Sequence, residues 1–204
     1  MAWLQTLDLA LFQIVNHHLA NPAFDFLLPL FREKWFWAPL YLYVLAFAWQ
    51  QFRRRRFWFF VLSVALSVGA ADFISSSIIK KSVQRLRPCN DPAVRETVAL
   101  RVSCGSGYSF TSSHAANHFA FAVFVGAALG RRMRRLRQGL LVWAGLVALA
   151  QVYVGVHYPL DVVFGGLLGA GIGGVFAAWF LKRAPFNGDW ANSTPTDAAG
   201  SARA

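Results

Sequence analysis

The chain of 204 residues is 56% hydrophobic and only 14% charged, whereas about a quarter of the residues are charged in a typical soluble domain. Its net charge of +11 could suggest nucleic-acid binding, but the basic residues stand in blocks that flank apolar runs. That arrangement is typical of cytoplasmic loops that contact anionic lipids. Composition and charge placement therefore argue against a soluble domain and against a nucleic-acid partner.

The first 34 residues are predicted to form an N-terminal helical segment at the membrane surface. Between residues 3 and 15, apolar residues recur at helical spacing with polar residues between them, as in an amphipathic helix that lies in the interface. Asn21-Pro22 interrupts this helix, and the apolar run at residues 24–31 is too short to span a bilayer alone. A sixth, N-terminal span is the alternative.

Five apolar stretches follow, and each is predicted to be a transmembrane helix. A span needs about 20 apolar residues, and core helices of soluble proteins are rarely so long and so apolar. Residues 35–183 therefore indicate an all-α integral membrane domain, a bundle of five to six transmembrane helices. The predicted spans are residues 35–50, 57–79, 112–129, 139–156 and 160–181.

Blocks of basic residues set the predicted orientation of this bundle. Such blocks occur at residues 53–56, 131–137 and 182–183, and the positive-inside rule puts them in the cytoplasm. Residues 80–111 then form an extracytoplasmic loop. The polar tail at residues 184–204 is predicted to be a disordered cytoplasmic end.

The outer loop at residues 80–111 is too long to be a simple connector, and it holds both cysteines, Cys89 and Cys104. Long connections without secondary structure are usually functional or disordered. In an oxidising compartment a disulfide can persist. This favours a bridge over the alternative of two free thiols.

Anion-binding groups gather at the outer ends of the predicted helices. Lys80 and Arg87 offer positive charge and a planar donor fork that suits phosphate oxygens. Residues 111–114 open a helix, and Ser or Thr there would serve as its N-cap. The free N–H groups and positive dipole end of a helix start attract anions.

Two histidines and an aspartate add reactive groups at the same membrane face. His157 and Asp161 lie four residues apart across a turn, so the carboxylate can orient the imidazole and leave its other nitrogen free to attack. His114 can protonate a leaving oxygen. Together with the cations, these are the parts that phosphoryl transfer needs.

Three motifs carry a resemblance to a known family. Residues 80–88 read K-x6-R-P, residues 111–114 stand where the family has P-S-G-H, and residues 150–161 stand where it has S-R-x5-H-x3-D. Over residues 57–181 the chain resembles the type 2 phosphatidic acid phosphatase (PAP2) superfamily. That superfamily includes bacterial membrane lipid phosphatases and soluble vanadium haloperoxidases, so the resemblance implies a PAP2/haloperoxidase-like core.

The resemblance implies a role for each residue that matches a motif. Lys80 and Arg87 would bind phosphate, Ser112 would help to hold it, His114 would be the general acid, His157 the nucleophile that becomes phosphorylated, and Asp161 its charge partner. No metal or other cofactor is expected, because cations and a helix start supply the electrostatic stabilisation.

Two positions depart from the family pattern. Ser113 stands where the family has glycine, and Gln151 stands where it has a third cation, an arginine. Both are kept among the predicted phosphate-binding residues, although glutamine brings no charge. Losing one charge-assisted contact costs about 1.5–3 kcal/mol. Candidates to compensate are Lys81, Arg85, Arg95 and Arg101.

The predicted function is a metal-independent lipid phosphatase of a bacterial cytoplasmic membrane, with its active site on the extracytoplasmic face. The first-choice substrate is undecaprenyl diphosphate. Phosphatidic acid, phosphatidylglycerophosphate and lipid A are alternatives. Two other classes stay open: a vanadium haloperoxidase-like enzyme, and an inactive protein that only binds or transports lipid phosphates.

Overall fold

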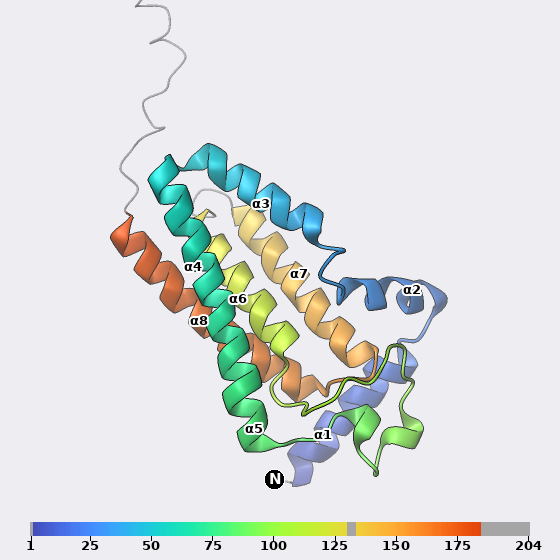
Figure 1. Ribbon diagram of the computed structural model, residues 1–204. Coiled ribbons are helices and arrows are strands. Elements are labelled where there is room, and N and C mark those ends of the chain that lie inside the picture. Colours follow the sequence, from blue (N-terminus) through green and yellow to red (C-terminus); the bar gives the residue numbers. More distant parts are fainter. Residues whose placement is uncertain (1, 130–133, 185–204) are drawn as a thin grey trace, which may run out of the picture.

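The computed structural model describes residues 2–129 and 134–184, and within these ranges the chain is helical with no strands. Figure 1 shows the helices gathered into one bundle. The predicted tail lies outside the described residues except for Ala184, and so do Arg131 and Arg132 of the second basic block.

Four long helices form the centre of the bundle and pack side by side (Figure 1): α4 (Arg54–Phe73), α6 (Ser113–Ala128), α7 (Arg134–Tyr153) and α8 (Pro159–Arg183). Helix α3 (Ala38–Gln51) crosses the outside of this group near the start of α4. Each of the five predicted spans therefore corresponds to a helix. Aromatic and small side chains fill the largest core cluster, which joins α3, α4, α6, α7 and α8.

Three helical segments are long and apolar enough to cross a membrane: Arg54–Asn90, Arg134–Tyr153 and Pro159–Arg183. Helices α3 and α6 have 14 and 16 residues, so at 1.5 Å per residue they measure about 21 and 24 Å. They are shorter than the hydrocarbon core, which is about 30 Å thick. The protein is thus an all-helical membrane protein with spans of unequal length.

Glycines let α8 approach α6 unusually closely. A Cβ atom at Gly165, Gly169 or Gly173 would lie 2.5, 2.0 or 2.5 Å from a backbone oxygen of α6. Because these glycines are spaced four residues apart, they form one stripe along the helix, as in small-residue interfaces of membrane helices. This contact holds the start of α6 next to the start of α8, where the predicted site residues lie.

Helix α4 continues through a π-helical segment, η2 (Ile74–Ile79), and a short turn, α5 (Lys80–Val83). The helix ends at Gln84, which has a positive φ of 53°. The span predicted to stop at residue 79 therefore carries Lys80 on its last turn. Two short 3-10 turns follow, η3 (Pro88–Asn90) and η4 (Arg95–Thr97).

The N-terminal segment forms the predicted helix, α1 (Ala2–Gln13), extended by η1 (Ile14–His18). Asn21 ends this unit and caps the next helix, α2 (Pro22–Phe31), by accepting a hydrogen bond from the N–H of Phe24. The segment is not separate from the bundle, because Asp8, Phe12 and Asn16 are fully buried against it. Asn16, for example, bonds to the carbonyl oxygen of Tyr153 at 2.8 Å.

Candidate active site

The predicted nucleophile, His157, lies in the turn between α7 and α8, and its side chain is only 2% exposed. Gly155 makes this turn possible, since its φ of +86° is a conformation that favours glycine. A Cβ there would also lie 2.7 Å from Val98. The N–H of His157 then donates to the carbonyl oxygen of Gln151 at 3.3 Å.

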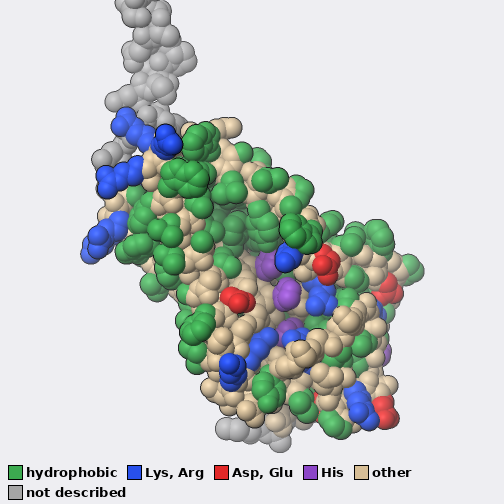
Figure 2. All heavy atoms as spheres, viewed as in Figure 1, with side chains coloured by type: hydrophobic (Ala, Val, Ile, Leu, Met, Phe, Trp, Pro, Cys, Tyr) green, Lys and Arg blue, Asp and Glu red, His purple; other side chains and the backbone are tan. Residues whose placement is uncertain are grey.

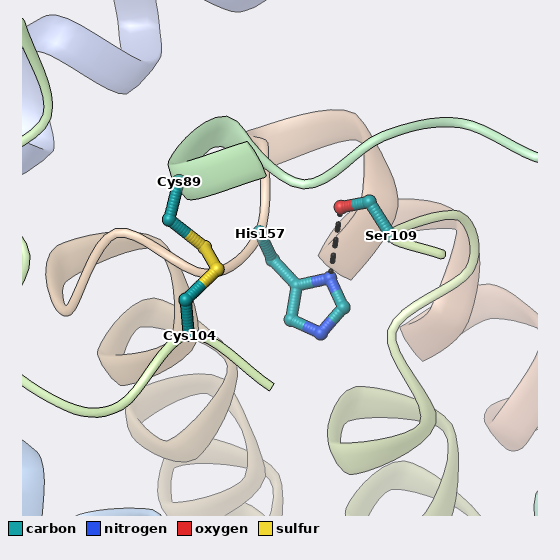
Figure 3. The surroundings of a disulfide bond; sticks show 4 residues. All are labelled: Cys89, Cys104, Ser109 and His157. Atoms are coloured by element: carbon teal, nitrogen blue, oxygen red, sulfur yellow. Dashed lines mark hydrogen bonds between the residues drawn. A yellow bond between two sulfur atoms is a disulfide. The ribbon is translucent and has the colours of Figure 1, made fainter. Parts of the chain in front are cut away.

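Ser109 stands between His157 and Asp161. The Ser109 hydroxyl donates to Oδ2 of Asp161, and its oxygen lies 3.3 Å from Nδ1 of His157 (Figure 3). A hydroxyl has a single proton, so Ser109 must accept from a protonated Nδ1. The carboxylate itself is 3.6 Å from Nδ1, which exceeds a normal hydrogen bond. The other ring nitrogen, Nε2, is left unprotonated.

Asp161 is held by more partners than the sequence suggested. Its Oδ1 accepts from Arg85 at 2.8 Å, and its Oδ2 also accepts from the N–H of Tyr158 at 2.8 Å. Arg85 bonds in turn to Asp8 of α1 at 2.6 Å, and both carboxylates are fully buried. Arg85 thus neutralises two buried acids.

Three residues of this network, Asp8, Arg85 and Ser109, were not predicted as members of the site. Arg85 was proposed only as a substitute phosphate ligand, and its two ion pairs to carboxylates argue against that role. A single acidic residue within the amphipathic helix at residues 3–15 was a usable signal for Asp8. No local pattern distinguishes Ser109 from the other serines of the loop.

Burial, together with the charges of Arg87 and Lys80, lowers the pKa of His157 to about 4 against the opposing effect of Asp161. The imidazole is therefore neutral at physiological pH. A neutral ring with its proton on Nδ1 has a lone pair on Nε2, which is the form that a nucleophile requires.

The start of α6 lies against the start of α8. Ser112 is the N-cap, and its hydroxyl accepts a long hydrogen bond, 3.4 Å, from the N–H of Ala115. The N–H of Ser112 donates to the carbonyl oxygen of Asp161 at 3.0 Å. His114 follows on the first turn, within electrostatic range of His157 and Lys80. His118 donates from Nδ1 to the carbonyl oxygen of His114 at 2.7 Å, which explains this second histidine as a packing residue.

Ser113, at the family's glycine position, turns its side chain toward α4. Its hydroxyl makes hydrogen bonds of 2.7 and 2.8 Å with the hydroxyls of Ser75 and Ser76 in the π-helical segment. The extra side chain is thus accommodated by neighbouring serines. These bonds occupy the hydroxyl, so a phosphate contact at this position would fall to the backbone N–H.

Among the described residues, no carboxylate forms an ion pair with either of the two predicted cations, Lys80 and Arg87. Arg87 lies over the loop backbone, where a Cβ at Gly105 would be 3.8 Å from its guanidinium carbon. The positive charges of Lys80 and Arg87 repel each other, and both disfavour a proton on His157. Figure 2 shows histidine side chains in a hollow of the molecule with lysine and arginine side chains beside them.

Several buried polar atoms around the site lack a hydrogen-bond partner among the described residues. They are Nε of Arg87, Oγ1 of Thr111, and both side-chain atoms of Gln151, which is fully buried. Buried polar atoms are nearly always bonded, so these atoms are positioned to receive a polar ligand. In the same described part of the chain, no three His, Cys, Asp or Glu side chains form a group that could hold a metal ion.

Cys89 and Cys104 form a disulfide across the loop, with their Cα atoms 6.0 Å apart (Figure 3). The bridge starts two residues after Arg87 and ends next to Gly105, so it closes the part of the loop that packs against the Arg87 guanidinium.

Residues 56–185 match the model of the PAP2 superfamily. The chain is 32% identical over 156 residues to a lipid A 4′-phosphatase of Bacteroides thetaiotaomicron, covering 76% of this chain and 68% of that protein. It is 36% identical over 126 residues to a decaprenylphosphoryl-5-phosphoribose phosphatase of Mycobacterium tuberculosis, covering 60% of this chain and 61% of that protein.

A solved structure has the same fold. It is a transmembrane PAP2-type phosphatidylglycerolphosphate phosphatase from Bacillus subtilis, with a TM-score of 0.72 and 20% identity, covering 91% of this chain and 90% of that chain. Since the family model spans more than half of the sequence, the chain belongs to the PAP2 superfamily, among its membrane lipid phosphatases.

Proposed function

We propose that the protein hydrolyses a lipid phosphate through a phospho-histidine formed on His157. The observation that carries this proposal is the hydrogen-bonded chain from Nδ1 of His157 through Ser109 to Asp161. It leaves Nε2 as the free nucleophile of a buried, neutral imidazole.

The proposed reaction has two steps. In the first, Nε2 of His157 attacks phosphorus, the bond from phosphorus to the leaving oxygen breaks, and His114 donates a proton to that oxygen. In the second, water attacks the phosphorus of phospho-His157 while His114 takes a proton from the water. The N–P bond then breaks, and inorganic phosphate leaves.

The phosphate oxygens would be held by Lys80, Arg87, the hydroxyl of Ser112 and the N–H groups at the start of α6. The amide of Gln151 is an additional donor, because it is buried next to the His157 turn without a partner. Cations and a helix start supply the stabilisation that a metal provides in other phosphatases, so we propose a metal-independent reaction.

A phosphomonoester of lipid A is the substrate that we favour, because the match to the lipid A 4′-phosphatase of Bacteroides thetaiotaomicron covers more of both chains than the match to the decaprenyl-linked relative does. A polyprenyl substrate such as undecaprenyl diphosphate is the second candidate, supported by the relative that acts on a decaprenyl phosphosugar. An apolar cavity of about 380 Å³ beside His118, lined by residues of α3, α4 and α6, offers room for a hydrocarbon chain.

We further propose that the site faces outward from a bacterial cytoplasmic membrane. The basic residues at the start of α4 and the end of α8 lie at one end of the bundle, and the site loop lies at the other (Figure 1). The disulfide in that loop is compatible with an oxidising compartment.

The test compares wild type with His157→Asn and with His18→Asn, a control at an exposed histidine. Each protein, purified in detergent, is given a panel of lipid phosphates, with and without a chelator. We expect phosphate release by wild type and the control, loss in His157→Asn, and no effect of the chelator. An acid-labile phospho-enzyme should be trapped from wild type and the control, but not from His157→Asn.

Two results would contradict the proposal. Full activity in His157→Asn would exclude this nucleophile, and chelator-sensitive release would exclude the metal-free reaction. Binding of lipid phosphates without turnover would instead favour an inactive binding protein. Bromination that depends on vanadate would favour a haloperoxidase-like enzyme.

A further inference from the structure

The phosphate site lacks the third cation of its family, because the uncharged Gln151 stands in the arginine position. A cation from elsewhere in the fold could fill this gap. Arg32, at the end of α2, is outside the region that matches the family model, so sequence motifs give no hint of it.

Packing holds Arg32 beside the end of α7. The preceding residue, Phe31, packs on a buried cluster that includes Ala150 and Val154, which lie one residue before and three residues after Gln151. The carbonyl oxygen of Phe31 also accepts a hydrogen bond of 2.8 Å from the indole N–H of Trp37. Arg32 is thus fixed on a short loop against the helix end that carries the missing cation position.

The same loop reaches the histidines of α6. The ring of Trp37 lies 5.5 Å from that of Trp143, and Trp143 lies 4.9 Å from His118. His118 stacks on His114 at 6.4 Å. Trp37 of this loop is thus connected to His114, the proposed acid, through the rings of Trp143 and His118.

The charge of Arg32 is not neutralised by the protein. Its side chain is partly buried, yet within the described residues it has no hydrogen bond or ion pair, and the acid that acts on it is the exposed Glu33. Its positive charge disfavours the charged forms of Arg87 and His114. Like charges close together disfavour each other, so an anion bound near these two partly buried arginines would be stabilised by both.

An ordinary structural role explains Arg32 less well. Arginine at a helix C-terminus can bond to the last carbonyl groups of the helix. The Arg32 guanidinium makes no such bond among the described residues, so capping does not account for its position.

We propose that Arg32 is a phosphate-binding residue that supplies the third cation of the site in place of the arginine absent at position 151. This inference rests on the proposed function, and it assigns part of the N-terminal segment to the phosphate site. The ligand is a phosphate group that carries two negative charges, and the guanidinium fork would donate to its oxygens.

The experiment compares Arg32→Ala and Arg32→Lys with Lys34→Ala, which removes an exposed charge from the same loop. Two measurements are made: kcat/KM on a lipid phosphate, and the affinity for inorganic vanadate, a phosphate analogue that needs no lipid. We expect Arg32→Ala to lower both by roughly 10- to 100-fold, the effect of one charge-assisted contact. Arg32→Lys should fall between Arg32→Ala and wild type, and Lys34→Ala should match wild type.

The two readouts separate the failure of this inference from the failure of the proposed function. If Arg32→Ala stays within about twofold of Lys34→Ala in vanadate affinity, Arg32 is not part of the site, whatever the lipid activity. If wild type hydrolyses no lipid phosphate but Arg32→Ala still weakens vanadate binding, the anion site stands and the proposed phosphatase function fails.

Discussion

The hydroxyl oxygen of Ser109 lies 3.3 Å from Nδ1 of His157, closer than the carboxylate of Asp161 at 3.6 Å. The serine comes from the loop at residues 80–111, whereas His157 lies in the α7–α8 turn and Asp161 lies on the first turn of α8. Orientation of the proposed nucleophile therefore depends on a loop residue as well as on the H-x3-D motif.

Replacing Ser109 with alanine should lower kcat by about tenfold, because the ring loses a hydrogen bond that contributes about 1 kcal/mol and its tautomer is no longer set. Steady-state phosphate release measures this effect. Ser103→Ala, at an exposed serine of the same loop, is the control and should behave as wild type. Equal kcat in the two variants would show that Asp161 orients the ring directly.

Arg85→Met should destabilise the fold by about 3–5 kcal/mol, because it leaves two buried carboxylates without their counter-charge. Asp8→Asn should cost less, since it removes one of those charges together with its ion pair. Thermal melting followed by circular dichroism in detergent measures both. Arg95→Met, at an exposed arginine, is the control, and a shared melting temperature would contradict the role of Arg85.

His157 should stay neutral well below the usual histidine range, since its pKa is lowered to about 4. The 15N shifts of histidine-labelled protein report this titration, with His157→Asn identifying the signal. A midpoint near 6.5, the ordinary value, would contradict the burial of the ring.

The same shift has a consequence for stability. Between about pH 6.5 and pH 4 the unfolded chain binds a proton on His157 that the folded protein does not bind. Stability contributed by this residue should therefore fall as the pH is lowered through this window. Melting curves of wild type and His157→Asn over this range test it, and the variant should show the shallower dependence.

Gly169→Ala should disrupt the contact between α6 and α8, because the new Cβ would lie 2.0 Å from the carbonyl oxygen of Ala116. Such overpacking costs about 1–3 kcal/mol or more. Gly171→Ala is a matched control two residues away, where nothing lies within 4 Å of the added atom. A lower melting temperature in Gly169→Ala alone is expected, and equal melting of both variants would contradict the close packing.

The sequence by itself determined the membrane class, the positions of the helices and the break at Asn21-Pro22. In a bilayer, every backbone N–H and C=O group must be hydrogen-bonded within the protein. Long apolar runs therefore predict membrane helices without a structure. A Ser or Thr cap at the start of α6 was also readable, and the structure assigns it to Ser112. These features depend on neighbours within a few residues.

Only the tertiary structure decided which side chains surround His157. Ser109 and Asp161 are 52 positions apart, and Arg85 and Asp8 are 77 apart, so no local periodicity connects them. Arg32 and the end of α7 likewise meet through packing of Phe31. The motifs identify groups that can react, but the loop and the N-terminal helices that orient and charge them are brought there by long-range contacts, which sequence spacing does not encode.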